Sequence, residues 1–291
     1  MEKVQKKSIL WKYMFFNTLF KDENMKIAHF SDPHLGAPTD DWTALFDKRW
    51  VGLFNYKFRR SYQHDPKYLE KAVQYILDND FDAVVCTGDL TNTGQPNEFA
   101  TVKKILQRLV DSDIPVIYTP GNHDCYVKRR HCVEAVRDMV SFFTRNDYTL
   151  DDLPVVRHIK GIDFIIFNNS RPTNLIFSGA WVTKKDSDRI EEICSQEKKF
   201  PRILVNHYPI IEDQPILRMR HRLYCQGRIE KLLKSRSIDL SICGHRHFYY
   251  TKCDDTGRGE LCTGSVTKNA LMSEIEFKDD KFTLKKIYLE N

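Results

Sequence analysis

The stretch TPGNHDCY, residues 119–126, places an amide, an imidazole and a carboxylate side by side directly after an apolar run. Asn and Asp are common turn residues, so an ordinary surface turn is one interpretation of this stretch. A turn has no need of His123 between them, and the other interpretation is a reactive site at the end of a strand. The segments on either side decide between the two.

Short β-rich runs alternate with helical segments on both sides of this stretch. The predicted strands before the C-terminal region cover residues 26–31, 82–87, 114–119, 162–168, 202–207 and 238–243. The predicted helices cover residues 65–80, 96–111, 132–143, 185–194 and 227–234. Four further strands are predicted at 248–253, 260–266, 272–278 and 282–290, joined by turns such as Asp279-Asp280. This order predicts an α/β fold with an antiparallel β ending.

The composition is that of a folded globular chain. Its 291 residues, 41% hydrophobic and 29% charged, suffice for one large α/β domain or two small ones, and no composition shift marks a boundary. The net charge of +5 permits an anionic substrate or membrane surface but does not call for nucleic acid. Eight cysteines without a CxxC pair predict reduced thiols in the cytoplasm. A disulfide framework or a zinc knuckle is the alternative.

Residues 1–24 are predicted to be an amphipathic extension of a single domain that covers residues 25–291. Trp11, Met14, Phe15 and Leu19 recur at helical spacing between lysines, which suits a helix lying in a membrane interface. The apolar run is too short to span a bilayer, and no signal-peptide cleavage site follows it. The alternatives are a helix docked on the domain itself and sequence upstream of a start at Met25. We therefore expect a cytoplasmic protein, with peripheral binding to the inner face of the plasma membrane as the membrane interpretation.

Residues 41–64 interrupt the alternation of strands and helices. This segment holds seven aromatic residues and five Lys or Arg against two Asp. A plain connection from a strand to a helix needs only a few residues, so the segment is an insertion with its own role.

Polar side chains capable of binding metal follow five of the predicted strands. These residues are Asp32, His34, Asp89, Asn122, His207, His245 and His247. In open α/β sheets, the loops beyond the carboxyl ends of the strands line one crevice. Mixed nitrogen and oxygen donors suit Mn, Fe or Zn, and seven donors fit two ions rather than one tetrahedral ion. Each residue alone has an ordinary explanation as a cap, a turn or a core residue, but five strand ends in order are hard to attribute to chance.

In these motifs the sequence resembles the calcineurin-like metallophosphoesterase family. The family pattern is D-x-H, GD, GNH(D/E), a strand-end His and GH-x-H, and it runs here from Lys26 to about Val266. It is matched by Asp32-Pro33-His34, Gly88-Asp89, Gly121-Asn122-His123-Asp124, His207 and Gly244-His245-Arg246-His247. The resemblance implies a four-layer αββα sandwich with two central mixed β-sheets. Pro33 and Arg246 are small departures from the usual residues at those positions.

The resemblance also implies a role for each matching residue. Asp32, His34 and His247 resemble the ligands of one metal ion, Asn122, His207 and His245 those of the other, and Asp89 the bridging carboxylate. A metal-bound hydroxide would attack phosphorus in line, while His123 stabilises or protonates the leaving oxygen and Asp124 orients the His123 ring. We expect two divalent ions, Mn²⁺ first, with Fe or Zn as alternatives. The complete ligand set argues against a non-catalytic member.

The remaining histidines lack a motif and are predicted to have structural roles. His29 is expected in the core, and His64, His131, His158 and His221 are expected at the surface or as caps.

The substrate is a separate question from the metal site. The insertion resembles a segment of chlamydial-type UDP-2,3-diacylglucosamine pyrophosphatases of lipid A synthesis, which release UMP, whereas GDLTNTG resembles the branch that includes cyclic nucleotide phosphodiesterases. Aromatic side chains flanked by cations suit a lipid substrate at an anionic bilayer. The candidate substrate-binding residues are Arg49, Trp50, Arg59, Arg60, Arg220 and Arg246. The alternatives are a soluble cyclic nucleotide phosphodiesterase, a non-catalytic scaffold and, for the insertion itself, a packed helical hairpin with snorkelling cations.

Overall fold

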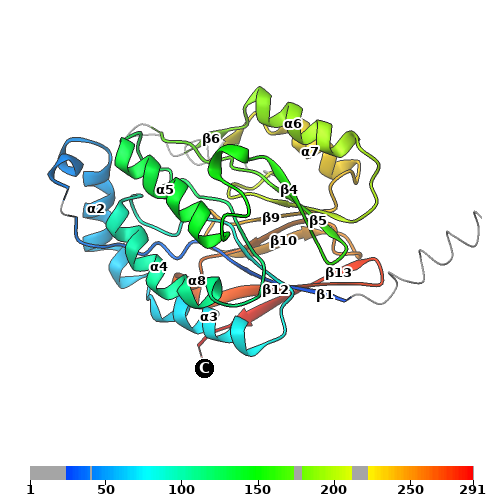
Figure 1. Ribbon diagram of the computed structural model, residues 1–291, viewed down its shortest axis with the longest axis horizontal. Helices are drawn as coiled ribbons and strands as arrows, with labels where there is room; N and C mark the ends of the chain where they lie inside the picture. The colour runs from blue at the N-terminus through cyan, green and yellow to red at the C-terminus, as the bar shows by residue number, and fades with distance from the viewer. Residues whose placement is uncertain (1–23, 40, 174–178, 212–221, 291) are drawn as a thin grey trace, which may run out of the picture.

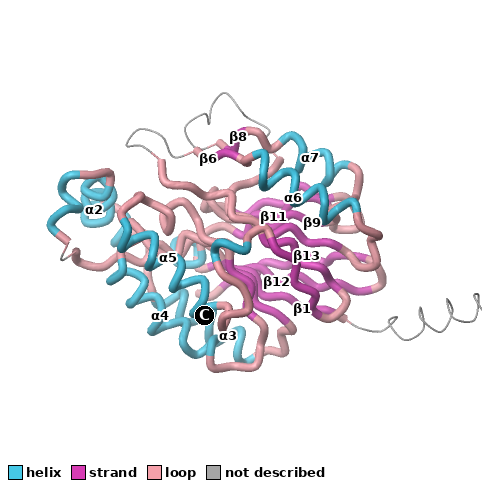
Figure 2. Tube along the Cα trace, turned by 45° about the horizontal axis from the view of Figure 1, so that its top comes forward, coloured by secondary structure: helices cyan, strands magenta, loops and turns pink. Residues whose placement is uncertain are grey.

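The computed structural model of the protein describes residues 24–39, 41–173, 179–211 and 222–290. Two β-sheets lie face to face between two groups of helices (Figures 1 and 2). The predicted extension at residues 1–24 lies outside the described residues except for Asn24, and so do Arg220 and His221. Within the described residues, no helix is both long enough and apolar enough to cross a membrane.

The first sheet has five strands. In spatial order they are β13 (Lys281–Tyr288), β12 (Leu271–Lys278), β1 (Met25–Phe30), β2 (Ala83–Cys86) and β3 (Val116–Tyr118). The three strands β1, β2 and β3 run parallel, and β12 is antiparallel to both β1 and β13. This sheet is therefore mixed, as the resemblance implied.

The second sheet has six strands. In spatial order they are β10 (Tyr249–Cys253), β11 (Gly259–Thr263), β9 (Leu240–Cys243), β7 (Arg202–Val205), β5 (Ile162–Ile166) and β4 (Val155–Ile159). Its four central strands run parallel, and β10 and β4 are antiparallel edge strands. Two short strands, β6 (Ala180–Trp181) and β8 (Leu223–Tyr224), pair separately.

Helices cover the outer faces of both sheets. The helices are α2 (Arg49–Phe58), α3 (Lys67–Asp78), α4 (Pro96–Val110), α5 (Arg130–Phe143), α6 (Lys184–Ser195), α7 (Gly227–Lys234) and α8 (Val266–Asn269). The described part of the chain also has three 3₁₀ turns, at Trp42–Phe46, Arg60–Tyr62 and Leu150–Asp152. Figure 2 shows α3, α4 and α5 on one side of the strands and α6 and α7 on the other.

Alternation along the strands divides the apolar side chains between two cores. In β5, Phe164 and Ile166 join the main core between the sheets, whereas Ile165 joins a second core beneath α6 and α7. The neighbouring strand β7 repeats this pattern, with Leu204 facing the second core. Successive side chains of a strand point to opposite faces of the sheet, and both faces of these central strands are buried. Their sequence is therefore apolar at nearly every position.

Residues 155–159 and the insertion are two of the regions that add to the pattern predicted from sequence. Residues 155–159 form β4, which is partly exposed and pairs with β5 through a tight turn at Lys160-Gly161, where both φ angles are positive. An edge strand that buries little apolar surface gives a weak sequence signal. The insertion forms a 3₁₀ turn, α2 and a second 3₁₀ turn, and it lies at one end of the molecule (Figure 1).

Candidate metal centre

All seven predicted ligands meet at the carboxyl ends of the parallel strands. Asp32 and His34 follow β1, Asp89 follows β2, Asn122 follows β3, His207 follows β7, and His245 and His247 follow β9. Hydrogen bonds join the first two loops, since the His34 N–H donates to the Asp89 carbonyl at 2.9 Å. The two sheets thus contribute to one shared edge, as the strand-end pattern predicted.

The backbone is strained at five of these seven residues. Their φ values are 54° at Asp32, 49° at His34, 54° at Asp89, 66° at His245 and 55° at His247. Positive φ is uncommon for residues with a side chain, and such residues cluster at functional sites. The fold therefore holds these side chains in a conformation that isolated loops would avoid.

The first group of donors consists of Asp32, His34, Asp89 and His247. Its ligand atoms all lie within 4.8 Å of one another. His34 Nε2 lies 2.8 Å from His247 Nε2 and 3.5 Å from Asp89 Oδ2, and His247 Nε2 lies 3.3 Å from Asp32 Oδ1. Four donors thus point at one small volume.

The second group consists of Asp89, His207 and His245, with Asn122 beside them. Asp89 Oδ2 lies 3.4 Å from His207 Nε2. The Asn122 Oδ1 atom lies 3.2 Å from His207 Nε2 and 3.0 Å from His245 Nδ1. Asp89 therefore belongs to both groups, which is the position of a bridging ligand.

The chemistry of these donors fits two divalent cations. Bonds of about 2.1 Å to nitrogen or oxygen place neighbouring donors roughly 3–3.5 Å apart, close to the separations observed. Asp89 Oδ2 is buried and has no hydrogen-bond partner among the described residues, although it lies between two imidazoles. An ionised oxygen without a partner inside a protein is costly unless a cation binds it.

Glycine is required where the loops carrying these ligands cross. A Cβ atom on Gly121 would lie 2.1 Å from Asp89 Oδ1 and 2.4 Å from Asp89 N. Any side chain at position 121 would therefore displace the shared carboxylate.

Hydrogen bonds to the far side of the ligands orient them toward the site. His207 Nδ1 lies 2.7 Å from the Thr87 carbonyl, so Nδ1 carries the proton and Nε2 is left as the donor atom. The His245 N–H donates to Asp32 Oδ2 at 2.9 Å.

Electrostatics favour the protonation states that metal ligands need at His34 and Asp89, but not at His207. Burial opposes protonation of His207, yet the Asp89 carboxylate raises its pKa to about 9, so a cation that binds there must displace a proton. Burial lowers the pKa of His34 well below its ordinary value, and the Arg60 guanidinium lowers it further. Burial opposes ionisation of Asp89, but the His207 and His123 rings hold its pKa below the ordinary value. A neutral imidazole and an ionised carboxylate are the forms that bind cations.

His123 lies beside the donor groups without joining either of them. Its backbone N–H donates to Asp89 Oδ1 at 2.6 Å, and its ring Nδ1 lies 2.6 Å from the Asn92 carbonyl. The ring stacks on Tyr126 with centroids 5.2 Å apart. Nδ1 therefore carries the proton donated to Asn92, and Nε2 is the unprotonated ring atom, which faces the Arg60 guanidinium.

The expectation that Asp124 orients the His123 ring is wrong. The buried Asp124 carboxylate instead accepts hydrogen bonds from the N–H groups of Thr91 and Gly121, both at 3.0 Å, and from the Tyr118 hydroxyl at 2.9 Å. Asp124 ties together the loops after β2 and β3, and the Asn92 carbonyl orients the imidazole. The side chain points into the protein because three donors there outweigh one ring N–H.

The insertion brings Arg60 to the site. Arg60 Nη1 lies 2.8 Å from Asn92 Oδ1 and 3.1 Å from His123 Nδ1, and Nη2 lies 3.1 Å from His123 Nε2. A cavity of about 190 Å³ beside Arg60 is lined also by Asn55, Arg59, Gln63, His64, His247 and Lys268. The positions of Arg60 and Arg59 agree with their predicted contact with substrate, which stays a prediction.

The expectation that His64 is a surface or capping residue is wrong. His64 is buried, its ring centroid lies 5.0 Å from that of His34, and its Nδ1 lies 2.8 Å from Thr267 Oγ1. Burial lowers the pKa of His64 to about 3, so the ring is neutral beside the metal ligands. No spacing in the sequence signals this position, because the insertion folds back over the loop after β1.

Arg49 does not face the site, in contrast to its predicted role in substrate binding. It is fully buried, and its guanidinium contacts both oxygens of Asp47 at 2.9 Å and Asp41 Oδ2 at 2.5 Å. These ion pairs connect the start of α2 to Asp41 and Asp47, the two residues that flank the 3₁₀ turn at Trp42–Phe46. Trp50 remains half exposed on α2, and Arg246 is partly buried between two ligands.

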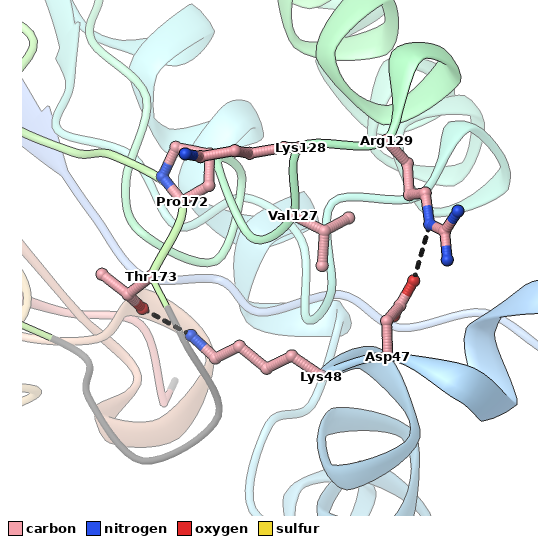
Figure 3. Close-up of a pocket in the computed structure, with 7 residues that line it drawn as sticks. All are labelled: Asp47, Lys48, Val127, Lys128, Arg129, Pro172 and Thr173. Atoms are coloured by element: carbon pink, nitrogen blue, oxygen red, sulfur yellow. Dashed lines mark hydrogen bonds and ion pairs between the residues drawn. The ribbon is translucent and has the colours of Figure 1, made fainter.

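Sequence reasoning missed Lys48 and Tyr126. Lys48 Nζ lies 4.3 Å from the centre of the Tyr126 ring and donates to Thr173 Oγ1 at 2.7 Å. Lys48 lines a cavity of about 610 Å³ with Asp47, Val127, Lys128, Arg129, Pro172 and Thr173 (Figure 3). Burial lowers the pKa of Lys48 to about 8, opposed by the Asp89 carboxylate.

Comparisons with known proteins agree with this geometry. A family model described as calcineurin-like phosphoesterase matches residues 25–249. The chain is 24% identical over 171 residues to a "Probable cyclic nucleotide phosphodiesterase" of Rhodococcus erythropolis, which covers 58% of this chain and 52% of that protein. The chain thus spans about half the length of this relative.

Two solved structures share the fold. A dimetal phosphatase from Danio rerio superposes with a TM-score of 0.65 at 14% identity, over 91% of this chain and 96% of that one. A purple acid phosphatase from yellow lupin seeds superposes with a TM-score of 0.62 at 12% identity, over 92% of this chain and 52% of that one. These likenesses confirm the predicted layered α/β arrangement with two central mixed sheets.

Proposed function

The chain belongs to the calcineurin-like phosphoesterase family, and we propose that it is a metal-dependent hydrolase that cleaves the pyrophosphate bond of a nucleotide-linked lipid. The substrate we favour is UDP-2,3-diacylglucosamine, with release of UMP. The observation that carries the metal dependence is the pair of donor groups that share Asp89.

Two divalent ions held by these donors would supply an activated water and neutralise charge on the phosphoryl group. We propose Mn²⁺ as the first metal to test, with Fe and Zn as alternatives. Asp32, His34 and His247 would hold one ion, and Asn122, His207 and His245 the other.

His123 would act on the leaving oxygen. Its Nδ1 proton is committed to the Asn92 carbonyl, and Nε2 lies 3.1 Å from Arg60 Nη2. To act on the leaving oxygen, Nε2 would have to exchange this contact for the substrate and take up a proton. The fixed ring orientation removes the entropic cost of aligning the imidazole.

Exposed aromatic side chains in the insertion support a lipid substrate. Trp42, Phe46 and Tyr62 expose 72%, 74% and 84% of their surface. On α2, Trp50, Phe54 and Phe58 follow at intervals of four residues, so they form one apolar stripe. Large exposed apolar patches mark sites for partners, ligands or membranes. We propose that this face contacts acyl chains and the surface of an anionic membrane.

A second candidate is hydrolysis of a cyclic nucleotide. The observation that favours it is the similarity to the Rhodococcus protein described as a cyclic nucleotide phosphodiesterase. This candidate predicts turnover without lipid or detergent and gives the exposed aromatic side chains no role.

The metal-dependent activity is tested with the Mn²⁺-loaded protein and bis(p-nitrophenyl) phosphate. We expect Asp89→Asn and His123→Ala each to abolish hydrolysis while circular dichroism shows an intact fold. His158→Ala is the matched control, because His158 is half exposed on the edge strand β4 and contacts Asp163 and Phe200 rather than a metal ligand. Full activity of both site variants would contradict the assignment.

The substrate is tested by incubating the same protein with UDP-2,3-diacylglucosamine and with cyclic AMP. Products are identified by mass spectrometry. UMP from the lipid supports the favoured substrate. Turnover of cyclic AMP without UMP from the lipid would replace it with the second candidate.

A further inference from the structure

A cavity of about 610 Å³ lies outside the metal centre (Figure 3). Its volume falls within the range of about 300–1,000 Å³ that is typical of small-molecule sites. Among the described residues that line it, none is a candidate metal ligand and none lines the smaller cavity beside Arg60. The Tyr126 ring connects the two regions, since it stacks on His123 at 5.2 Å and lies 4.3 Å from Lys48 Nζ. The cavity is therefore a separate site near the reactive centre.

The charge of the cavity is predominantly positive. Its described lining holds three cationic residues, Lys48, Lys128 and Arg129, and one acidic residue, Asp47. The Asp47 carboxylate already accepts hydrogen bonds from Arg49 Nε at 2.9 Å and from Arg129 Nε at 3.0 Å. It is thus committed to two guanidinium groups and leaves the charge of the lysines uncompensated, which favours an anionic occupant.

Lys48 is the least compensated cation of this lining. Its side chain is partly buried, and among the described residues no carboxylate lies within 4.0 Å of its Nζ atom. Lys26, which is also partly buried, pairs with Glu274 at 3.2 Å. A partly buried charge without a counter-ion is destabilising. The position of Lys48 therefore calls for an explanation other than the stability of the insertion.

Hydrogen-bond donors without acceptors gather on one side of the cavity. Lys48 Nζ donates to Thr173 Oγ1 at 2.7 Å, and its ammonium group has two further N–H donors. The Thr173 hydroxyl accepts this bond and donates to no other group in the described structure. Figure 3 shows Lys48 and Lys128 extending toward Pro172 and Thr173, whereas Arg129 turns to Asp47. Ammonium and hydroxyl donors in this arrangement suit the oxygens of a phosphate group.

We propose that this cavity binds a small phosphate monoester, whose phosphate group contacts Lys48, Lys128 and Thr173. Val127 and Pro172 supply apolar surface for its organic part. The inference goes beyond the proposed hydrolysis, because the site contains no candidate metal ligand and binding involves no covalent step. Inorganic phosphate offers the same oxygens without the organic part, so a comparison of the two ligands distinguishes an ester from the free ion.

The site is tested by calorimetry with the full-length, metal-free chain, using adenosine 5′-monophosphate and inorganic phosphate as probes. We expect both to bind, with the monoester binding more tightly. Lys48→Met should raise the Kd of each probe at least about tenfold, because it removes a partly buried charge-assisted donor. Lys48→Arg should retain most of the affinity. Lys57→Met is the matched control, since it removes the same charge from an exposed position of the insertion.

Two further variants locate the bound anion. Lys128→Met tests the same cavity from an exposed position, where the substitution does not endanger folding, and should raise the Kd about threefold. Arg60→Met tests the smaller cavity beside the metal ligands and should leave the Kd within about twofold of the wild type. Because no metal ion is present, a failure of the proposed hydrolysis would not change these values.

The possible outcomes either support the site or remove it. A loss of affinity in Lys48→Met and Lys128→Met, with wild-type affinity in Lys57→Met and Arg60→Met, supports it. No binding in the wild type, unchanged binding in Lys48→Met, or an equal loss in Arg60→Met would overturn it. Equal affinity for both probes would restrict the site to the phosphate ion and overturn the assignment of a monoester.

Discussion

Replacing Arg49 by Met should release the insertion from the domain without unfolding the rest of the chain. The guanidinium of Arg49 donates from Nε to Asp47 Oδ1 and from Nη2 to Asp47 Oδ2, both at 2.9 Å. It also donates to Asp41 Oδ2 at 2.5 Å and to Thr43 Oγ1 at 2.9 Å. Met fills a similar volume but leaves both carboxylates without this partner.

The size of the effect depends on which partners the Asp41 and Asp47 carboxylates retain in Arg49→Met. Breaking a buried ion pair by removing one partner costs about 3–5 kcal/mol. Asp47 retains Arg129 at 3.0 Å and Asp41 retains His131 at 3.0 Å, so we take the lower end, about 3 kcal/mol. Each 1.4 kcal/mol is a factor of ten, so local opening of the insertion should become roughly a hundredfold more frequent.

Hydrogen exchange read by mass spectrometry measures this opening. Amides in residues 41–64 should exchange roughly a hundredfold faster in Arg49→Met, and amides in β1, β2 and α4 should keep their wild-type rates. Arg130→Met is the control, because Arg130 is exposed and Glu134 is its only ion-pair partner among the residues that the structure describes. Wild-type exchange in the insertion of Arg49→Met would refute the structural role assigned to Arg49, and equal acceleration throughout the chain would refute its local character.

Three further predictions concern the site and its support. Asp124→Ala should lower the free energy of unfolding by about 3 kcal/mol in chemical denaturation, because it leaves several buried donors unpaired; a stability loss under 1 kcal/mol would contradict this. Gly121→Ala should lose at least one bound metal ion and most activity, because its Cβ would collide with Asp89. Gly227→Ala, whose Cβ has no atom within 4 Å, should change neither. The number of metal ions bound per chain is the measurement, and an unchanged number in Gly121→Ala would contradict the prediction. Burial lowers the pKa of Lys48 to about 8, so in the metal-free chain its amine should lose its proton as pH rises through 8, as followed by NMR of the lysine side chain; a midpoint near the ordinary value of 10.5 would contradict this.

The strand-end ligands could be predicted from sequence because their order reflects topology. Each short apolar run predicts a buried strand, and the polar residues that follow parallel strands lie at the same edge of the sheet. Asp89 after β2 and His207 after β7 come from different sheets, yet both follow a fully buried strand. The turn at Asp279-Asp280 could be predicted from local sequence, because aspartate tolerates the positive φ that a tight hairpin turn requires. Both residues have positive φ in the structure.

The surroundings of the ligands could not be predicted, because they depend on how the insertion folds back. Arg49 and Arg60 occupy the same basic and aromatic segment, and nothing in their spacing separates the buried structural cation from the one at the site. His64 contacts Thr267, which is distant in sequence and has no motif of its own. Asp124 follows His123 directly, but its side chain turns to Thr91 and Gly121 instead. Tertiary contacts, rather than the local sequence, determine where these side chains lie.

Metal stoichiometry tests the central claim most directly, namely that Asp89 is shared by two metal positions. The protein is equilibrated with Mn²⁺, freed of excess ion and measured by inductively coupled plasma mass spectrometry, alongside Asp89→Asn. We predict two ions per chain in the wild type and loss of at least one in Asp89→Asn. No more than one ion in the wild type, or two ions retained in Asp89→Asn, would contradict the shared site.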